Sequence, residues 1–127
     1  MELELKKLTK EFQGFKAVDD ITLTMSNGVY GLLGVNGAGK TTTIRHLMGF
    51  IRPKKGSCHI GGLDCWTKRA EIQRDLGYIP GEINFFDDMT GREFLRFMTR
   101  YRHLPKNNRQ KELLERFDLN PKGKIKK

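Results

Sequence analysis

The sequence contains the nine-residue stretch Gly34-Val35-Asn36-Gly37-Ala38-Gly39-Lys40-Thr41-Thr42. It has the pattern of a phosphate-binding loop: Gly, four residues, Gly, Lys, and then Ser or Thr. Glycines allow the backbone to turn tightly and direct its N–H groups toward phosphate oxygens. Lys40 can reach the β- and γ-phosphates of a nucleotide, and the Thr41 hydroxyl can bind Mg²⁺. We therefore predict that these nine residues bind a nucleotide.

The residues on either side of this loop have the pattern that such a site requires. The apolar run at residues 29–33, Val-Tyr-Gly-Leu-Leu, predicts a buried strand that enters the loop. Ile44, Leu47 and Met48 recur at the spacing of one helix face, which predicts that a helix begins at residues 39–41. The alternative is an ordinary Gly-rich turn between a strand and a helix. The context favours the nucleotide site.

The composition restricts the classes of protein to which this chain can belong. The chain has 127 residues, with 37% hydrophobic and 31% charged, as expected for one domain or a large part of one. The first residues lack the apolar core of a signal peptide, and no apolar stretch approaches the length of a membrane span. Cys58 and Cys65 do not have a metal-binding or redox spacing. We expect them to be reduced cysteines without a role, in a cytoplasmic protein.

The positive charge is concentrated near the end of the chain. The net charge is +9, and residues 92–127 carry 12 basic and 4 acidic side chains. One interpretation is a surface for nucleic acid or another anion. The other is a solvated helix face, which we favour.

The first part of the chain predicts antiparallel strands. Alternating apolar residues predict strands at about residues 3–9 and 18–25, joined by a short turn at residues 12–15. A further short strand is expected at residues 57–60, before Gly61 and Gly62, and a helix at about residues 67–75. Residues 76–80 predict a second buried strand, which ends at Pro80.

The remainder of the chain predicts two helices. Thr90 and Glu93 have the spacing of a capping box that begins a helix. Its apolar stripe, which we expect to be core, is Phe94, Phe97, Met98 and Tyr101. Another face carries Arg92, Arg96 and Arg100. A second helix is expected from about residue 107 to residue 117.

The order of these features resembles the ATP-binding cassette (ABC) ATPase domain. The matching segments are Leu8-Thr9-Lys10-Glu11-Phe12, Ala17-Val18-Asp19-Asp20-Ile21, the phosphate-binding loop, Pro53-Lys54-Lys55-Gly56, Gly77-Tyr78-Ile79-Pro80 and Met89-Thr90-Gly91-Arg92-Glu93-Phe94-Leu95. The resemblance implies an α/β fold: a P-loop NTPase core with N-terminal antiparallel strands and the start of a helical subdomain. The corresponding divisions are residues 1–28 for the antiparallel region, 29–88 for the core and 89–127 for the helical subdomain.

The resemblance also implies a function. It implies an ATP-binding subunit of an ABC transporter that binds Mg²⁺ and ATP and, as a complete domain, hydrolyses ATP to drive transport. The family's adenine-stacking aromatic falls at Phe12; the alternative is a turn aromatic that packs on the sheet. The implied partners are a membrane-spanning subunit or domain and a second ABC ATPase domain, at the cytoplasmic face of the membrane, with no nucleic acid.

Two departures from the family pattern limit this expectation. Gly81, followed by Glu82, stands where the family usually has the glutamine that contacts Mg²⁺ and the attacking water. The family's signature motif, Walker B aspartate, catalytic glutamate and switch histidine would lie after Lys127. We therefore expect the N-terminal half of an ABC ATPase domain, with no catalytic residue in this chain and with apolar surface left uncovered. For this chain alone we expect nucleotide binding that is weak at best, and no appreciable hydrolysis.

The three histidines match no family position, and we expect surface or packing roles for His46, His59 and His103. Two alternative functions stay open. One is an ABC protein associated with nucleic acid or the ribosome, through the basic end of the chain. The other is a nucleotide-binding module that does not hydrolyse ATP, for which Gly81 is the supporting feature.

Overall fold

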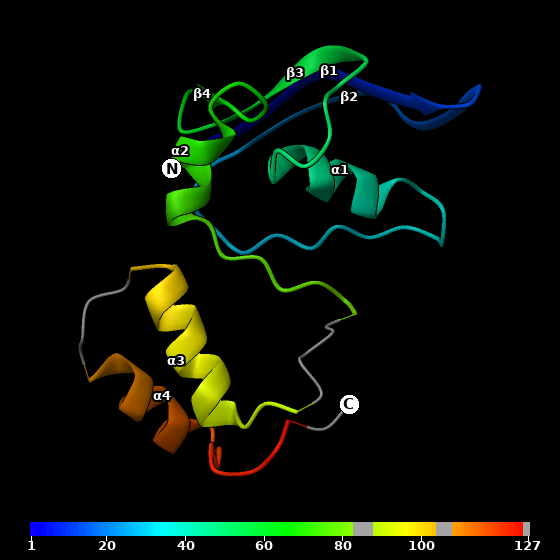
Figure 1. The fold of residues 1–127 in the computed structure, drawn as a ribbon. Helices are drawn as coiled ribbons and strands as arrows, with labels where there is room; N and C mark the ends of the chain where they lie inside the picture. The colour runs from blue at the N-terminus through cyan, green and yellow to red at the C-terminus, as the bar shows by residue number, and fades with distance from the viewer. Residues whose placement is uncertain (83–87, 104–107, 126–127) are drawn as a thin grey trace. The chain divides into compact units, whose positions relative to one another are not determined.

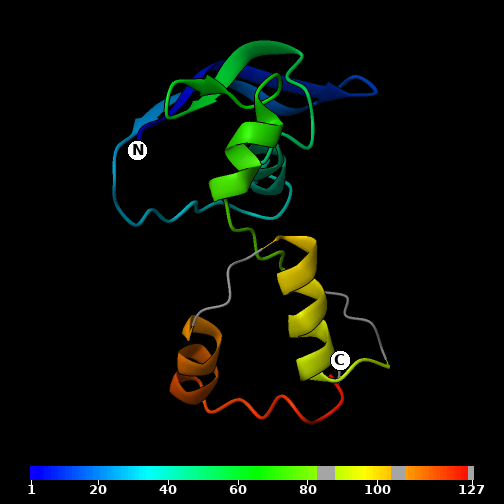
Figure 2. The same ribbon diagram turned by 60° about the vertical axis from the view of Figure 1, so that its left-hand side comes forward.

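The computed structural model describes residues 1–82, 88–103 and 108–125. The chain divides into two compact units, Met1–Tyr78 and Ile79–Lys127, and each is described by itself. Figure 1 and Figure 2 show a β-sheet with helices α1 and α2 in the first unit, and helices α3 and α4 in the second. The expected divisions at residues 28/29 and 88/89 stay a prediction.

The first unit is built on an antiparallel sheet with the strand order β2-β1-β3-β4. Strands β1 (Leu3–Phe12) and β2 (Phe15–Met25) form the expected hairpin, with Gln13 and Gly14 in left-handed conformations at its turn. Strand β3 (Lys55–Ile60) pairs with the other edge of β1, and β4 (Leu63–Asp64) follows it. The predicted strands at residues 3–9, 18–25 and 57–60 are therefore confirmed.

An irregularity in β1 determines which of its leucines are buried. Simple alternation would place Leu5 and Leu8 on opposite faces of the sheet. The pairing with β2 shifts between these two residues, and Lys7 has a left-handed φ of 49°. Because this bulge adds a residue to the strand, Leu5 and Leu8 both lie in the core, at 1% and 0% exposure.

The core lies between the sheet and its two helices. Helices α1 (Lys40–Leu47) and α2 (Arg69–Asp75) lie on the same face of the sheet in both views (Figures 1 and 2). The buried cluster comprises Leu5, Leu8, Val18, Cys58, Ile60, Cys65 and Ile72. Leu47 and Leu76 pack against it, so the expected inward faces of the two helices are confirmed.

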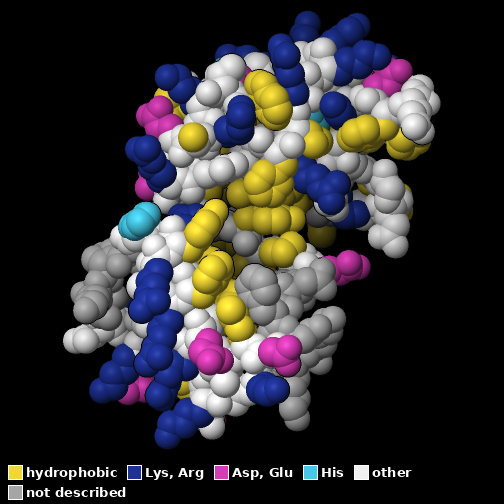
Figure 3. All heavy atoms as spheres, viewed as in Figure 1, with side chains coloured by type: hydrophobic (Ala, Val, Ile, Leu, Met, Phe, Trp, Pro, Cys, Tyr) yellow, Lys and Arg dark blue, Asp and Glu magenta, His cyan; other side chains and the backbone are white. Residues whose placement is uncertain are grey.

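Two predicted strands are absent. Residues 29–33 and 76–80 carry no strand, and Leu33 and Ile79 are 93% and 83% exposed. A strand needs a neighbour for its N–H and C=O groups, and among the described residues no strand pairs with either run. These predictions were wrong in this structure, whereas the expectation of uncovered apolar surface agrees with it. Hydrophobic side chains are visible on the surface in Figure 3.

The first helix of the second unit begins with the predicted capping box. The Thr90 hydroxyl accepts a hydrogen bond from the Glu93 N–H, and the Glu93 carboxylate accepts one from the Thr90 N–H at 2.8 Å. Helix α3 (Gly91–Tyr101) follows. The chain near residues 121–125 returns to this point, where the Arg92 N–H donates to the Pro121 carbonyl at 2.7 Å. Helix α4 (Arg109–Arg116) agrees with the helix expected near residues 107–117.

The apolar stripe of α3 is not core. Neither α3 nor α4 has a buried residue among those described, so these two short helices do not enclose a core. Phe97 is 42% exposed and its ring stacks on that of Tyr101, with centroids 6.0 Å apart. The expectation that the stripe is buried was therefore wrong. The expected basic face is present, since Arg92, Arg96 and Arg100 are exposed.

Candidate nucleotide-binding site

The phosphate-binding loop leads directly into helix α1, as predicted. Gly39 is the residue that precedes the helix, with a left-handed φ of 84°. Its carbonyl accepts the first helical hydrogen bond, from the Thr43 N–H at 2.8 Å, and another from the Thr43 hydroxyl at 3.0 Å. A helix that begins at Lys40 leaves N–H groups of its first turn free to bind an anion.

Glycine is required at position 39 by a close approach of strand β2. A Cβ atom there would lie 2.2 Å from the Ala17 carbonyl oxygen and 3.4 Å from a Val18 methyl group. The loop is thereby packed against the hairpin. Gly37 also has a left-handed φ, of 86°, but a Cβ there would meet nothing within 4 Å.

The Lys40 side chain folds back across the loop. Its ammonium group donates to the carbonyl oxygens of Gly34 at 2.6 Å and Val35 at 2.8 Å. The Ala38 N–H closes the turn to the Val35 carbonyl at 3.2 Å. These contacts hold a positive charge at the loop, where it can act on a phosphate group.

An open hollow of about 380 Å³ adjoins the loop. It brings Phe12 together with seven consecutive residues of the predicted site, Asn36, Gly37, Ala38, Gly39, Lys40, Thr41 and Thr42. Gly34 and Val35 do not line this hollow, and they take part through their hydrogen bonds to Lys40. The assignment of these residues to nucleotide binding stays a prediction.

The hairpin contributes two residues that the sequence reasoning missed, Phe15 and Ala17. Phe15 pairs with Phe12 across the turn, so both aromatic rings belong to the end of the hairpin that borders the loop. The turn residues Gln13 and Gly14 were the available signal, because a two-residue turn makes its flanking residues neighbours.

Phe12 is placed to stack on a flat ligand. It is 47% exposed, and the Lys10 ammonium lies 5.2 Å from its ring centroid. A half-exposed ring at the edge of a hollow retains surface on which a base could stack without hydrogen bonds. The choice between stacking and a turn aromatic packed on the sheet stays a prediction.

The charge around the loop suits an anion. None of the described residues that line this hollow is acidic, and the first turn of α1 has no acidic side chain. His46, on the buried face of α1, adds no positive charge at neutral pH, because burial lowers its pKa. Its Nδ1 lies 2.8 Å from the Thr42 carbonyl, so it is the packing residue that was expected.

Thr41 is the candidate ligand for Mg²⁺. Its side chain is exposed and lines the hollow. Among the residues that the structure describes, no group of three or more His, Cys, Asp or Glu could hold a metal. Mg²⁺ in nucleotide sites takes most of its ligands from phosphate oxygens and water, and a single hydroxyl beside a phosphate loop fits that arrangement.

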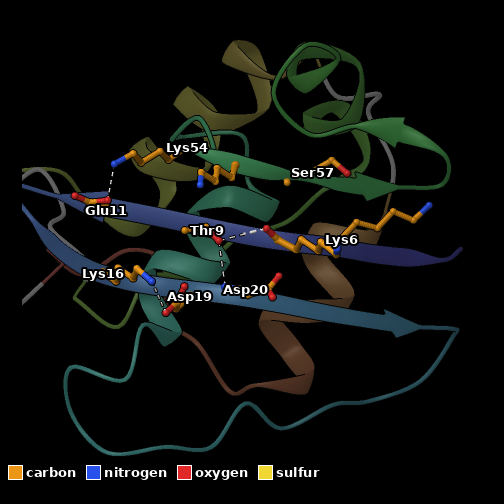
Figure 4. A pocket seen from close by; sticks show the side chains of 11 residues that line it. Lys6, Thr9, Glu11, Lys16, Asp19, Asp20, Lys54 and Ser57 are labelled. Atoms are coloured by element: carbon orange, nitrogen blue, oxygen red, sulfur yellow. Dashed lines mark hydrogen bonds and ion pairs between the residues drawn. The ribbon is translucent and has the colours of Figure 1, made fainter.

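A larger hollow, of about 570 Å³, lies over strands β1, β2 and β3 (Figure 4). Four of its eight charged side chains form two pairs: Lys54 with Glu11, and Lys16 with Asp19 at 2.9 Å. The hydrogen bond from Lys54 lowers the pKa of Glu11, and the one to Asp19 raises the pKa of Lys16. None of the described residues that line it is aromatic, so we do not assign the nucleotide to this hollow.

Comparison with known proteins identifies the family. Residues 18–127 match the family model described as ABC transporter. The chain belongs to the ABC transporter family. It is 39% identical over 109 residues to the bacitracin transport ATP-binding protein of Bacillus licheniformis, covering 85% of this chain and 36% of that protein. It is 37% identical over 124 residues to the lipopolysaccharide export system ATP-binding protein of Haemophilus influenzae, covering 92% and 52%.

Solved structures agree on the P-loop NTPase fold of ABC ATPases. An ATP-binding subunit of an ABC transporter aligns with a TM-score of 0.82 and 28% identity, covering 98% of this chain and 54% of that one. A putative ABC transporter ATP-binding protein from Pyrococcus furiosus aligns with a TM-score of 0.79 and 22% identity, covering 98% and 61%, and this likeness concerns the fold alone. The predicted fold class is confirmed. The chain spans about half or less of the length of the two relatives named above.

The family resemblance implies a glutamine at the position of Gly81. No described residue lies within 4 Å of the place that a Cβ atom on Gly81 would occupy, so packing against these residues does not require glycine there. None of the described helices is long and apolar enough to cross a membrane.

Proposed function

We propose that this chain is the ATP-binding part of an ABC transporter ATPase. The observation that carries the proposal is the hollow in which Phe12 of the hairpin and seven residues of the phosphate-binding loop line one surface. Phe12 would stack on adenine, and the loop would bind the phosphates. Membership of the ABC transporter family supports this assignment.

The loop would stabilise the triphosphate by position and charge. Lys40 would exchange its contacts with the Gly34 and Val35 carbonyls for β- and γ-phosphate oxygens. The N–H groups at the start of α1 would donate to the same phosphates. Mg²⁺, held in part by Thr41, would supply charge neutralisation between the phosphates.

The complete protein would hydrolyse ATP and use the energy for transport. This chain supplies the phosphate-binding half of such a site, and we expect no appreciable hydrolysis from it alone. The proposed partners are a second ABC ATPase domain and a membrane-spanning subunit or domain, with the protein peripheral on the cytoplasmic face. The transport and export names of the relatives support transport over the nucleic-acid and ribosome alternatives.

Calorimetric titration of Mg·ATP into the 127-residue chain tests the proposal. Saturable binding is expected, and it should be lost in Lys40→Ala. Lys55→Ala is the matched control, because this exposed lysine lines the other hollow and should leave the affinity unchanged. Equal affinity in the wild type and Lys40→Ala, or turnover of ATP that depends on Lys40, would contradict the account.

A further inference from the structure

The two cysteines of the chain meet in the core of the first unit. Cys58 lies in β3 and Cys65 follows β4, and each side chain is 2% exposed. Both are free thiols, and the Cys58 Sγ donates to the Cys65 Sγ at 2.8 Å. The sequence suggested no relationship between them, because their spacing matches no redox motif. The β3–β4 hairpin creates the relationship.

The hairpin register makes the two cysteines cross-strand neighbours. His59 pairs with Asp64 and Ile60 with Leu63, so the next pair in the same register is Cys58 with Cys65. The Cys65 N–H donates to the Cys58 carbonyl at 2.8 Å, which extends the ladder to this pair. Directly opposite residues in an antiparallel ladder have Cα atoms about 4.5–5.5 Å apart. This separation lies within the range of about 4.4–6.8 Å that a disulfide bond needs.

The surroundings favour oxidation over metal binding. Among the described residues, no set of three or more metal-ligating side chains gathers anywhere, so these two sulfurs have no further ligands of that kind. The hydrogen bond to Cys65, together with burial, raises the pKa of Cys58. The same hydrogen bond lowers the pKa of Cys65. The thiolate form, which attacks disulfides, is therefore favoured at Cys65.

We propose that Cys58 and Cys65 form a reversible intramolecular disulfide within the folded chain. The oxidant is a small-molecule disulfide such as oxidised glutathione. When local opening exposes it, the Cys65 thiolate attacks this oxidant and forms a mixed disulfide with release of one glutathione thiolate. The Cys58 sulfur, as its proton leaves, then attacks the Cys65 sulfur and releases the second glutathione. One sulfur–sulfur bond forms in the protein, two protons leave its thiols, and the two electrons reduce oxidised glutathione to two thiols.

The crosslink would act next to the helix that follows the phosphate-binding loop. A Cβ atom at Gly49, just after α1, would lie 2.5 Å from the Cys65 carbonyl oxygen. Cys65 is therefore in close contact with the residue that follows the end of α1. The disulfide would fix β3 to the segment that leads into α2, and so stabilise the native core.

Equilibration with glutathione tests the proposal and needs only the wild-type chain. The chain is unfolded in urea, then either refolded by dilution or kept in urea, in buffers with a range of ratios of oxidised to reduced glutathione. Free thiols are trapped with N-ethylmaleimide and the products are separated by intact mass. A chain with the internal disulfide is lighter than the reduced chain by the mass of two hydrogen atoms, and it does not react with N-ethylmaleimide.

At each glutathione ratio, we compare the amount of chain with the internal disulfide to the amount with two free thiols. This quotient should be higher in the refolded chain than in urea by a factor of about 30 or more. The melting temperature of the oxidised chain should be higher than that of the reduced chain. Cys58→Ser and Cys65→Ser are controls that should yield only mixed disulfides with glutathione. A ratio equal to or below that in urea, or mixed disulfides as the only products of the wild type, would overturn the proposal.

Discussion

The Ala17 carbonyl oxygen lies 2.2 Å from the position that a Cβ atom on Gly39 would occupy. This contact joins strand β2 to the residue that precedes helix α1. It explains why the phosphate-binding loop and the aromatic end of the hairpin border the same hollow. The glycine therefore has a packing role as well as the conformational role that the motif implies.

Gly39→Ala should destabilise the chain more than Gly37→Ala. Both residues have left-handed φ values, so each substitution costs about 1–2 kcal/mol of conformational strain. At position 39 the methyl group also meets a backbone oxygen, and overpacking adds about 1–3 kcal/mol. Urea unfolding followed by circular dichroism measures both variants. Equal losses of stability would contradict the close packing of the loop on β2.

Phe12→Ala should weaken ATP binding and leave triphosphate binding unchanged. Loss of a stacked base costs about 1–3 kcal/mol, which is roughly a 5- to 150-fold loss of affinity. Inorganic tripolyphosphate has no base, so its affinity should be the same in the variant as in the wild type. Phe12→Trp, which keeps an aromatic face, is the matched control. A variant that lost affinity for both ligands would indicate that Phe12 supports the loop and does not bind the base.

His46 should make the chain less stable in mild acid. Burial lowers its pKa below the value of about 6.5 that it has in the unfolded chain. The unfolded state therefore binds a proton that the folded state does not, and stability falls as the pH drops below about 6.5. His46→Gln should show a smaller loss of unfolding free energy between neutral and mildly acidic pH. Parallel pH profiles for the two proteins would show that His46 does not cause the effect.

Thr90→Ala should loosen the start of α3. Loss of an N-cap side chain costs about 1 kcal/mol, so the Glu93 amide, which donates to the Thr90 hydroxyl at 3.3 Å, should exchange about fivefold faster. The pKa of Glu93, which is lowered by hydrogen bonds from the Thr90 backbone and hydroxyl, should rise.

Thr99→Ala on the same helix is the control for the capping variant. The Thr99 hydroxyl bonds to the Leu95 carbonyl in the middle of the helix, where alanine is well tolerated. Exchange at Glu93 and its pKa should therefore stay unchanged. If Thr99→Ala changed them as much as Thr90→Ala does, the capping box would not be the cause.

Features that depend on neighbouring residues were predictable from the sequence. The phosphate-binding loop, the β1–β2 hairpin and the capping box of Thr90 and Glu93 each involve groups a few residues apart, and local chemistry specifies them. The same reasoning failed for residues 29–33. Their apolar composition suits a buried strand, but whether a strand forms depends on a pairing partner elsewhere in the chain.

Features that depend on register and distant contacts could not be predicted. The bulge at Lys7 brings Leu5 and Leu8 to one face, and no pattern of residue types required it. The contact between Cys58 and Cys65 follows from the register of a hairpin with a very short second strand. The place of Phe15 and Ala17 in the hollow follows from the packing of the loop against β2.

The central claim is that the hairpin end and the phosphate-binding loop form one nucleotide site, and an NMR titration tests it most directly. Mg·ATP is added to the isotope-labelled chain while the amide signals of Phe12, Phe15 and Ala17 and those of residues 36–42 are followed. The account predicts that both sets shift with a single dissociation constant, and that tripolyphosphate shifts only the loop set strongly. Shifts in the loop without shifts in the hairpin on adding Mg·ATP, or different dissociation constants for the two sets, would contradict it.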